Sequence, residues 1–286
     1  QGLNFVIRYR NNTGVTLKNI TIKAFLEGSI LDRLTLRPQN NGVVDFQTGA
    51  VIWGPGNTKE LRELESGKGG ELVMIITAKD PPPVIRAEDK NLVVLLRSSI
   101  SAATIPEELQ GTHLASEDTL TLKVASKVIF SGKVLHGASP IPNSGAFPPR
   151  VGEKTTYTVL WELKNFTNDL HNVRIEATFP PNVIWEGLMR TDGAPITYNR
   201  ASSQVRWDIG SVPAGAGVRS PTLTGAFQVS ITPADVDRGK TMRLINESIL
   251  TGTDVFTNTE VKRGINDMDT ELKFDSAAFF DNGVVQ

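Results

Sequence analysis

The chain has 286 residues, with 30 Lys and Arg, 31 Asp and Glu, a formal net charge of −1 and no Cys. Acidic and basic residues are intermixed and no basic run occurs, so nothing in the charge pattern indicates a nucleic-acid partner. The absence of Cys excludes disulfides, thiol catalysis and thiolate metal sites. No apolar run approaches the roughly 18 residues of a membrane-spanning helix, so we expect no membrane span in this chain.

The chain length favours about two domains. The first residues, QGLNFVIRYR, do not have the pattern of a signal peptide. A chain that starts at Gln1 indicates processing, or a segment of something longer.

Apolar residues alternate with polar ones from the start of the chain onward. The alternation is clear at residues 3–9, 20–24, 72–76 and 227–231. Such runs, separated by turns rich in Gly, Asn, Asp and Pro, predict strands. Residues 58–65 have helical composition, but we expect a short turn or helix there at most. Many short strands with frequent turns predict an all-β fold made of Ig-like β-sandwiches.

The chain also repeats itself at a spacing of about 150 residues, and repeats of this kind define the domain organisation. Residues 5–26 align without gaps on residues 158–180. In this alignment Val6 matches Val159, Asn12 matches Asn165 and Ile22 matches Ile175.

A second repeated segment is out of phase with the chain ends. Residues 121–134 (TLKVASKVIFSGKV) match residues 271–284 (ELKFDSAAFFDNGV). The earlier copy precedes the second copy of the 5–26 block, whereas the later copy precedes only the end of the chain. The alignment therefore predicts three segments: an Ig-like sandwich at 1–117 that lacks its own first strand, a second sandwich at 118–270, and an extra strand at 271–286.

Two segments with few strand signals separate these elements. Residues 105–119 are polar, and we expect them to link the two sandwiches. Residues 137–152 (GASPIPNSGAFPPRVG) are rich in Pro and Gly. Because Pro cannot pair within a central strand, we expect this segment to be a crossing loop inside the second sandwich.

The second sandwich carries an ordered series of motifs: TTYTVLWELKN, DLHNVRIEATFPPNVIW, VRWDIGSVPAGAG and NESILTGTD. In this order they resemble the tandem Ig-like conserved repeats of prokaryotic surface proteins. The first sandwich fits the pattern over residues 5–24 and around Trp53, and departs from it at residues 78–96. The resemblance implies tandem sandwiches on an extracellular stalk, layer or filament, and it implies little about a ligand.

No cluster of residues indicates catalysis. His113, His136 and His171 are too few and too scattered for a zinc site or a catalytic triad, so we expect a protein that is not an enzyme and has no cofactor. Asp267 and Asp269 offer the hard oxygen ligands that calcium prefers, but Asp is also an ordinary turn residue. Calcium binding there is left open, as is glycosylation at four Asn-x-Ser/Thr sequences.

The four Trp residues form two groups. Trp53 and Trp207 each follow an alternating strand at matching places, which predicts two core residues, with a sugar-stacking platform as the alternative. Trp161 and Trp185 have no counterpart in the first repeat, where Arg8 aligns with Trp161. We therefore expect them to serve something particular to the second sandwich, such as an exposed contact.

The C-terminal copy of the repeat predicts an assembly strand. If extended, it places Leu272, Phe274, Ala278 and Phe280 on one face. Burial of each large apolar side chain contributes about 1.5–3 kcal/mol, and the second sandwich already has its own copy of this strand. We expect donation to an open sheet edge of a neighbouring subunit; folding back onto its own chain would contradict donation.

The leading hypothesis is a structural subunit of an extracellular filament or surface stalk that assembles head to tail with other copies of itself. The alternative is a fragment of a multi-repeat cell-surface adhesin without self-assembly. A carbohydrate-binding or carbohydrate-active module is a third possibility, and it requires exposed aromatics or paired carboxylates. A cell-surface or glycan ligand is left open.

Overall fold

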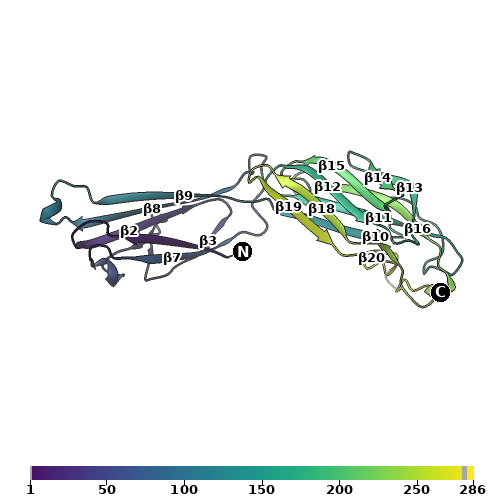
Figure 1. Ribbon diagram of the computed structural model, residues 1–286, viewed down its shortest axis with the longest axis horizontal. Helices are drawn as coiled ribbons and strands as arrows, with labels where there is room; N and C mark the ends of the chain where they lie inside the picture. The colour runs from purple at the N-terminus through teal and green to yellow at the C-terminus, as the bar shows by residue number, and fades with distance from the viewer. Residues whose placement is uncertain (1, 279–281) are drawn as a thin grey trace. The chain divides into compact units, whose positions relative to one another are not determined.

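The computed structural model describes residues 2–278 and 282–286, and these residues form strands joined by turns and short 3₁₀ segments. They divide into two compact units, each with its own hydrophobic core (Figure 1). Unit 1 comprises Gln1–Pro83 and Asn91–Val124, and unit 2 comprises Val84–Lys90 and Ala125–Gln286. The predicted all-β fold is confirmed. Within the part of the chain that the structure describes, no helix has the length and apolar character needed to cross a membrane.

Unit 1 is a sandwich of two antiparallel sheets. One sheet has the order β1-β7-β3, and the other has the order β4-β5-β2-β8-β9, with β6 paired to β2. The helical composition at residues 58–65 produces only a 3₁₀ turn at Lys59–Leu61, followed by β6. The strands are β1 (Gly2–Arg10), β2 (Leu17–Glu27), β3 (Leu31–Pro38), β4 (Val43–Val44), β5 (Val51–Trp53), β6 (Glu63–Leu64), β7 (Gly69–Ala78), β8 (Val93–Thr104) and β9 (Ala115–Lys123).

Unit 2 repeats this plan. Its sheets have the orders β10-β11-β16-β13 and β14-β15-β12-β18-β19, and β17 pairs with β20 beside them. The strands are β10 (Val128–Leu135), β11 (Thr155–Asn165), β12 (Leu170–Thr178), β13 (Ile184–Thr191), β14 (Ile196–Asn199), β15 (Gln204–Val212), β16 (Leu223–Ile231), β17 (Arg243–Ile245), β18 (Ser248–Asp254), β19 (Thr259–Ile265) and β20 (Met268–Asp269).

The boundary between the units differs from the expected division at 117/118. Residues 105–119 were expected to be a linker, but β9 begins at Ala115 and pairs with β8 along its whole length. The repeated segment 121–134 is therefore split: its first residues finish unit 1, and its last residues form β10 of unit 2. The sequence did not predict β9 here because charged residues obscure the alternation of apolar and polar side chains in this short stretch. Residues 137–152 contain no strand and connect β10 to β11 within unit 2, as predicted.

The gapless alignment of the two repeats is wrong by one residue within the first strand. The side-chain Nδ2 of Asn11 donates to Leu64 O, and the side-chain Nδ2 of Asn165 donates to Val212 O. These two bonds lie at corresponding places of the two sandwiches. Asn11, rather than Asn12, is thus the counterpart of Asn165, because the turn before β2 is one residue longer in unit 1. A shift of one residue moves a strand's side chains to the opposite face, which explains why Val6 is 47% exposed while Val159 is fully buried.

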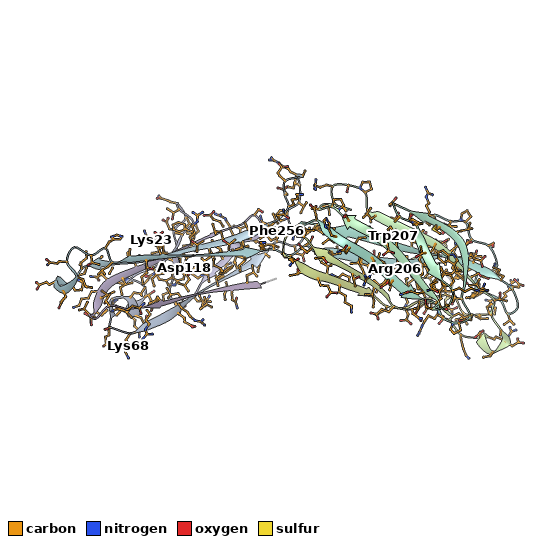
Figure 2. The ribbon with its side chains drawn as sticks, turned by 45° about the horizontal axis from the view of Figure 1, so that its top comes forward. Lys23, Lys68, Asp118, Arg206, Trp207 and Phe256 are labelled. Carbon is orange, nitrogen blue, oxygen red and sulfur yellow. The ribbon has the colours of Figure 1, made fainter. Side chains whose placement is uncertain are left out.

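Both sandwiches are centred on a tryptophan. Trp53 on β5 pairs with Ile22, and Trp207 on β15 (labelled in Figure 2) pairs with Ile175, so the two residues occupy equivalent places in the strand pairing. Both are fully buried. Each indole N–H donates to a backbone carbonyl, that of Gln39 at 2.8 Å or that of Ala194 at 2.9 Å. Burial with a satisfied N–H is typical of a core aromatic residue and leaves no face for a sugar.

The expected exposed role of Trp161 is wrong. The corrected alignment gives Trp161 the inward-facing Ile7 as its counterpart, and its indole is fully buried against Phe227 at 5.0 Å. Trp185 is partly buried and stacks on Tyr198 at 5.6 Å. Both residues therefore belong to the packing of unit 2.

Candidate strand-acceptor site

Apart from the β17-β20 pair of unit 2 and the short β6 of unit 1, the strands of the two units match except at one sheet edge. β1 corresponds to β11, because each pairs with the following strand of its sheet, β7 or β16. In unit 2, β11 also pairs with β10, from Val128↔Asn165 to Leu135↔Thr158. In unit 1, β7 is the one partner of β1 among residues 2–278 and 282–286. Unit 1 therefore has an open edge at the position that β10 closes in unit 2.

The hydrogen bond at the end of β1 shows to which side of the strand each backbone N–H and C=O group points. The N–H of Asn11 donates to Lys68 O at 2.8 Å, on the β7 side. Successive residues of an antiparallel strand direct their N–H and C=O to opposite sides, so every second residue of β1 faces away from β7. Unit 2 shows the same alternation, since the N–H of Phe166 donates to Lys127 O on the β10 side. The residues that face the open edge are Asn4, Val6, Arg8 and Arg10.

A groove of about 460 Å³ lies between β1 and β9, with β8 at its base. Leu120 and Leu122 of β9 lie opposite Leu96 and Val94 of β8. Directly opposite residues share a face of the sheet, so both β9 leucines point toward the core. They are nevertheless 45% and 39% exposed, whereas Leu96 and Val94 are buried. The groove thus leaves core-type apolar surface uncovered.

In unit 2 the corresponding space is filled by β10, which contacts β19 as well as β11. The inward side chains Val128, Phe130 and Val134 are all buried. At about 1.5–3 kcal/mol for each large apolar side chain, these three residues make a substantial contribution to the stability of unit 2. An added strand of similar composition would gain a comparable burial in the groove of unit 1.

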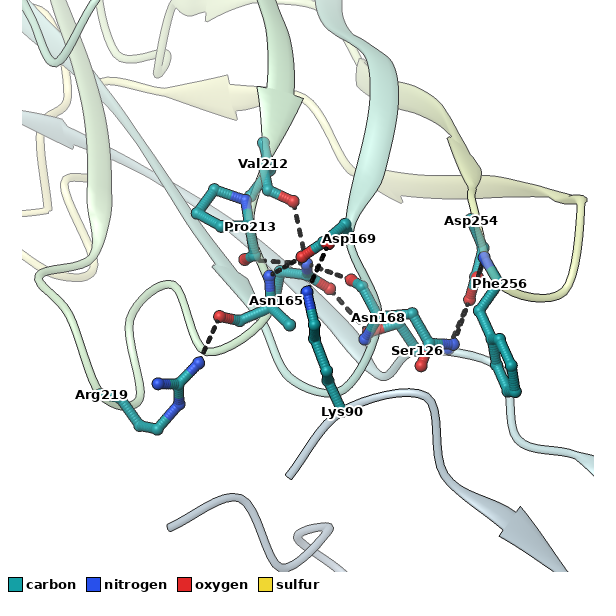
Figure 3. A network of polar contacts seen from close by, with 11 residues as sticks. Lys90, Ser126, Asn165, Asn168, Asp169, Val212, Pro213, Arg219, Asp254 and Phe256 are labelled. Atoms are coloured by element: carbon teal, nitrogen blue, oxygen red, sulfur yellow. Dashed lines mark hydrogen bonds and ion pairs between the residues drawn. The ribbon is translucent and has the colours of Figure 1, made fainter. Parts of the chain in front are cut away.

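A buried polar network holds the start of β10 in unit 2 (Figure 3). Ser126 donates from Oγ to Asn165 Oδ1 at 2.6 Å and from its N–H to Asp254 Oδ2 at 2.8 Å. Asn168 Nδ2 donates to the same Asp254 oxygen at 2.7 Å. Burial acts to raise the pKa of Asp254, but the hydrogen bonds from Asn168, Ser126 and Thr257 outweigh it and hold the pKa below 3.8.

The segment Val84–Lys90 contributes one exposed ion pair to the same end of unit 2. Lys90 Nζ lies 2.9 Å from Asp169 Oδ2 (Figure 3). The N–H of Ala214, followed by the Lys90 ammonium, lowers the pKa of Asp169. Because both side chains are about two-fifths exposed, the pair orders this segment with a contribution of about 0–1 kcal/mol.

Unit 1 satisfies the equivalent asparagine in a different way. Asn11 Oδ1 accepts hydrogen bonds from the N–H and the Oγ of Thr13, at 2.9 and 2.6 Å. Asn11 Nδ2 donates to Val15 O and Leu64 O, both at 2.8 Å. The local turn thus takes the place of Ser126, so unit 1 folds around Asn11 without a strand at the β10 position.

The expected assembly strand does not have the predicted form. In the described part of residues 271–286, no strand occurs, and Leu272 and Ala278 are buried in the core of unit 2. Phe274 is 67% exposed, so the proposed common face does not exist. Phe280 lies outside the described residues. The expectation that this segment has no place on its own chain is therefore wrong.

Asp275 is one of the residues that hold the C-terminal segment against its own unit. Its carboxylate accepts hydrogen bonds from the N–H groups of His136 at 2.6 Å, Gly137 at 2.7 Å and Ala138 at 3.3 Å. Burial acts to raise the pKa of Asp275, but these backbone donors prevail and hold it below 3.8. The sequence pattern offered no sign of this contact, since an Asp at an outward strand position looks solvent-facing.

The two candidate calcium ligands have protein partners. Asp267 Oδ2 lies 2.7 Å from Arg243 Nε, and Asp269 Oδ1 accepts a hydrogen bond from the N–H of Glu271 at 2.9 Å. No group of three or more His, Cys, Asp or Glu side chains with metal-binding geometry occurs among the described residues.

No protein-family model matches the sequence, and no curated protein matches it. Among solved structures, the C-terminal domain of the antigen I/II-family protein AspA of Streptococcus pyogenes is 10% identical, with a TM-score of 0.33, and the match covers 93% of this chain and 92% of that one. The major pilin subunit BcpA of Bacillus cereus is 8% identical, with a TM-score of 0.30, over 93% and 69% of the two chains. The full-length major pilin SpaD of Corynebacterium diphtheriae is 13% identical, with a TM-score of 0.30, over 89% and 59%. These likenesses are too distant to carry a functional argument.

Proposed function

We propose that the chain is a structural segment of an extracellular stalk or filament at a cell surface, built from tandem Ig-like units, and that it is not an enzyme. The observation that carries this proposal is the open β1 edge of unit 1, at the position that β10 closes in unit 2. A sandwich that takes a strand from outside its own fold is suited to joining units in series. An uncovered edge beside exposed Leu120 would otherwise promote aggregation.

The order of the strands along the chain supports a serial arrangement. β9 is the last strand of unit 1 and ends at Lys123, and β10 begins at Val128. The strand that closes unit 2 therefore directly follows the last strand of unit 1. A strand placed ahead of β1, as β10 is placed ahead of β11, would close the edge of unit 1 in the same way, which supports a chain of tandem units.

Head-to-tail self-assembly through residues 271–284 is the second candidate, because this segment repeats the sequence around β10. For donation, the segment would have to leave its own unit, where Leu272, Asp275 and Val285 are buried. Losing these contacts opposes the exchange, so the serial arrangement is the better supported of the two.

The test is to extend the chain ahead of Gly2 by a copy of residues 126–154, which contain β10 and its crossing loop. We expect the added strand to pair with β1, to bury Leu120 and Leu122, and to raise the free energy of unfolding of unit 1 by about 2–4 kcal/mol. Two substitutions at Val6, whose N–H faces the open edge, provide the control. Val6→Pro removes this N–H and is tolerated on an edge strand, whereas Val6→Thr keeps it.

The stabilisation should be lost in the extended chain with Val6→Pro and retained with Val6→Thr. An extended chain in which unit 1 is no more stable than in the original chain contradicts the proposal. Light scattering of the original chain at high concentration distinguishes the second candidate, since only self-assembly gives polymers that disappear with Val6→Pro.

A further inference from the structure

Resting on the proposed serial arrangement, we infer that the groove of unit 1 selects its strand by charge. It accepts an extended strand that carries an acidic side chain at the position of Lys133 in β10, and it discriminates against the basic strand that closes unit 2. The occupant is thus an extended segment, antiparallel to β1, with apolar side chains inward and an acidic side chain outward.

The register of the incoming strand follows from the match between the units. With Asn11 as the counterpart of Asn165, the partners of β10 on β11 transfer directly to β1. Phe130 and Val134 lie opposite Leu163 and Val159 in unit 2. The corresponding positions on β1 are Tyr9 and Phe5, which point into the core of unit 1. The alternation of inward apolar residues is therefore the same for both strands.

The outward positions differ between the two units. In unit 2, Lys133 Nζ of β10 lies 2.9 Å from Glu162 Oε2 of β11, and both side chains are partly covered. The counterpart of Glu162 in unit 1 is Arg8. A lysine at the position of Lys133 would thus meet a guanidinium instead of a carboxylate, and a glutamate there would restore the attraction.

The rim of the groove along β1 is basic even with its existing ion pair. Arg8 Nε lies 2.7 Å from Glu71 Oε1, and the Arg8 side chain remains 79% exposed. Arg10 follows on the same outward face and donates from Nε to Gly67 O at 3.1 Å. In unit 2 the same two positions carry Glu162 and Lys164, one acidic and one basic residue. The two rims therefore favour strands of different charge.

The inward centre of the groove differs as well. A Cβ at Gly132 of β10 would meet the side-chain end of Ile265, so a larger residue at this position in unit 2 requires the Ile265 side chain to move. Ile265 pairs with Ser248 on β18, and the matching residues of unit 1 are Asp118, which Figure 2 labels, and Ser98. Both line the groove. A strand bound to unit 1 therefore has room for a polar side chain at the position that Gly132 occupies in β10.

The test uses the full chain and two fluorescent ten-residue peptides. One has the sequence of residues 127–136 (KVIFSGKVLH), and the other carries Lys133→Glu. We expect the Glu peptide to bind about three- to tenfold more tightly at low salt, because a repulsive rim contact becomes attractive. The difference should shrink as the ionic strength rises and the exposed charges are screened. Fluorescence anisotropy measures both affinities.

A charge-swapped chain, Arg8→Glu with Glu71→Arg, keeps the ion pair of the rim and should reverse the preference. Equal binding of both peptides, at any salt concentration, overturns the charge selection and leaves the proposed function intact. If neither peptide binds, either to the natural chain or to the chain with Val6→Thr, the result contradicts the open edge. It then contradicts the proposed function as well. Polymers of the unmodified chain that the Glu peptide dissolves would identify a second copy as the source of the strand and overturn the serial arrangement.

Discussion

Replacing Asn165 with Ala tests whether the buried polar network at the start of β10 stabilises unit 2. The Asn165 side chain is fully buried. Its Nδ2 donates to Asn168 O at 2.7 Å, to Pro213 O at 3.1 Å and to Val212 O at 3.3 Å, and its Oδ1 accepts from Ser126 Oγ at 2.6 Å (Figure 3). The substitution removes all of these contacts and leaves each partner without its bond to Asn165.

The magnitude follows from the two shortest contacts. A buried partner that loses its hydrogen bond costs about 1–3 kcal/mol, and both Asn168 O and Ser126 Oγ lose a bond shorter than 2.8 Å. The longer bonds to Val212 O and Pro213 O add less. We therefore expect the free energy of unfolding of unit 2 to fall by about 3–5 kcal/mol, with unit 1 unchanged.

Urea unfolding followed by tryptophan fluorescence measures this effect, because Trp161, Trp185 and Trp207 all lie in unit 2. Asn246→Ala is the matched control, since Asn246 donates to Thr178 Oγ1 at an exposed site; we expect a change within about 0.5 kcal/mol. A loss below about 1 kcal/mol for Asn165→Ala would show that the network does not hold β10 in place.

Three further predictions concern the cores and the C-terminal segment. Trp53→Ala and Trp207→Ala should each lower the stability of their own unit by about 3–5 kcal/mol, as measured by hydrogen exchange in each unit; an equal loss in both units would contradict separate cores. Asp275→Asn should release the C-terminal segment, seen as faster proteolysis after residue 270, while Phe274→Ser at an exposed site should not. Asp254 and Asp275 have pKa values held below 3.8, so they stabilise unit 2 above pH 3.8 and this stability is lost as the pH falls through the lowered values. Urea midpoints measured between about pH 5 and pH 2 should drop more for the natural chain than for Asp275→Asn, and parallel curves would refute this linkage.

The fold class and the repeat were available from the sequence, because apolar alternation and the periodic motifs report directly on strands with one buried face. The detailed register was not. The turn before β2 is one residue longer in unit 1, which shifts the first strand by one residue. The gapless alignment therefore matched Trp161 with Arg8, whereas its structural counterpart is Ile7. Turn length changes register without changing the hydrophobic pattern, so a gapless alignment passes over it.

The missing copy of residues 121–134 ahead of unit 1 predicted an open sheet edge, and β7 is the one strand that pairs with β1 among the described residues. The fate of the C-terminal copy was not predictable in the same way. Its position depends on Asp275, which caps backbone N–H groups of His136 and Gly137 that lie more than a hundred residues earlier in the sequence. Contacts between a side chain and a distant backbone leave no periodic pattern.

Hydrogen exchange at single backbone amides tests the central claim most directly. In the unextended chain, the N–H groups of Val6, Arg8 and Arg10 face the open edge, whereas those of their counterparts Leu160, Glu162 and Lys164 face β10. We predict fast exchange for the first three amides and slow exchange for the second three, at a pH and temperature where both units stay folded. Equal protection of the two sets would mean that β1 already has a partner strand, and it would contradict the account of unit 1 as a strand acceptor.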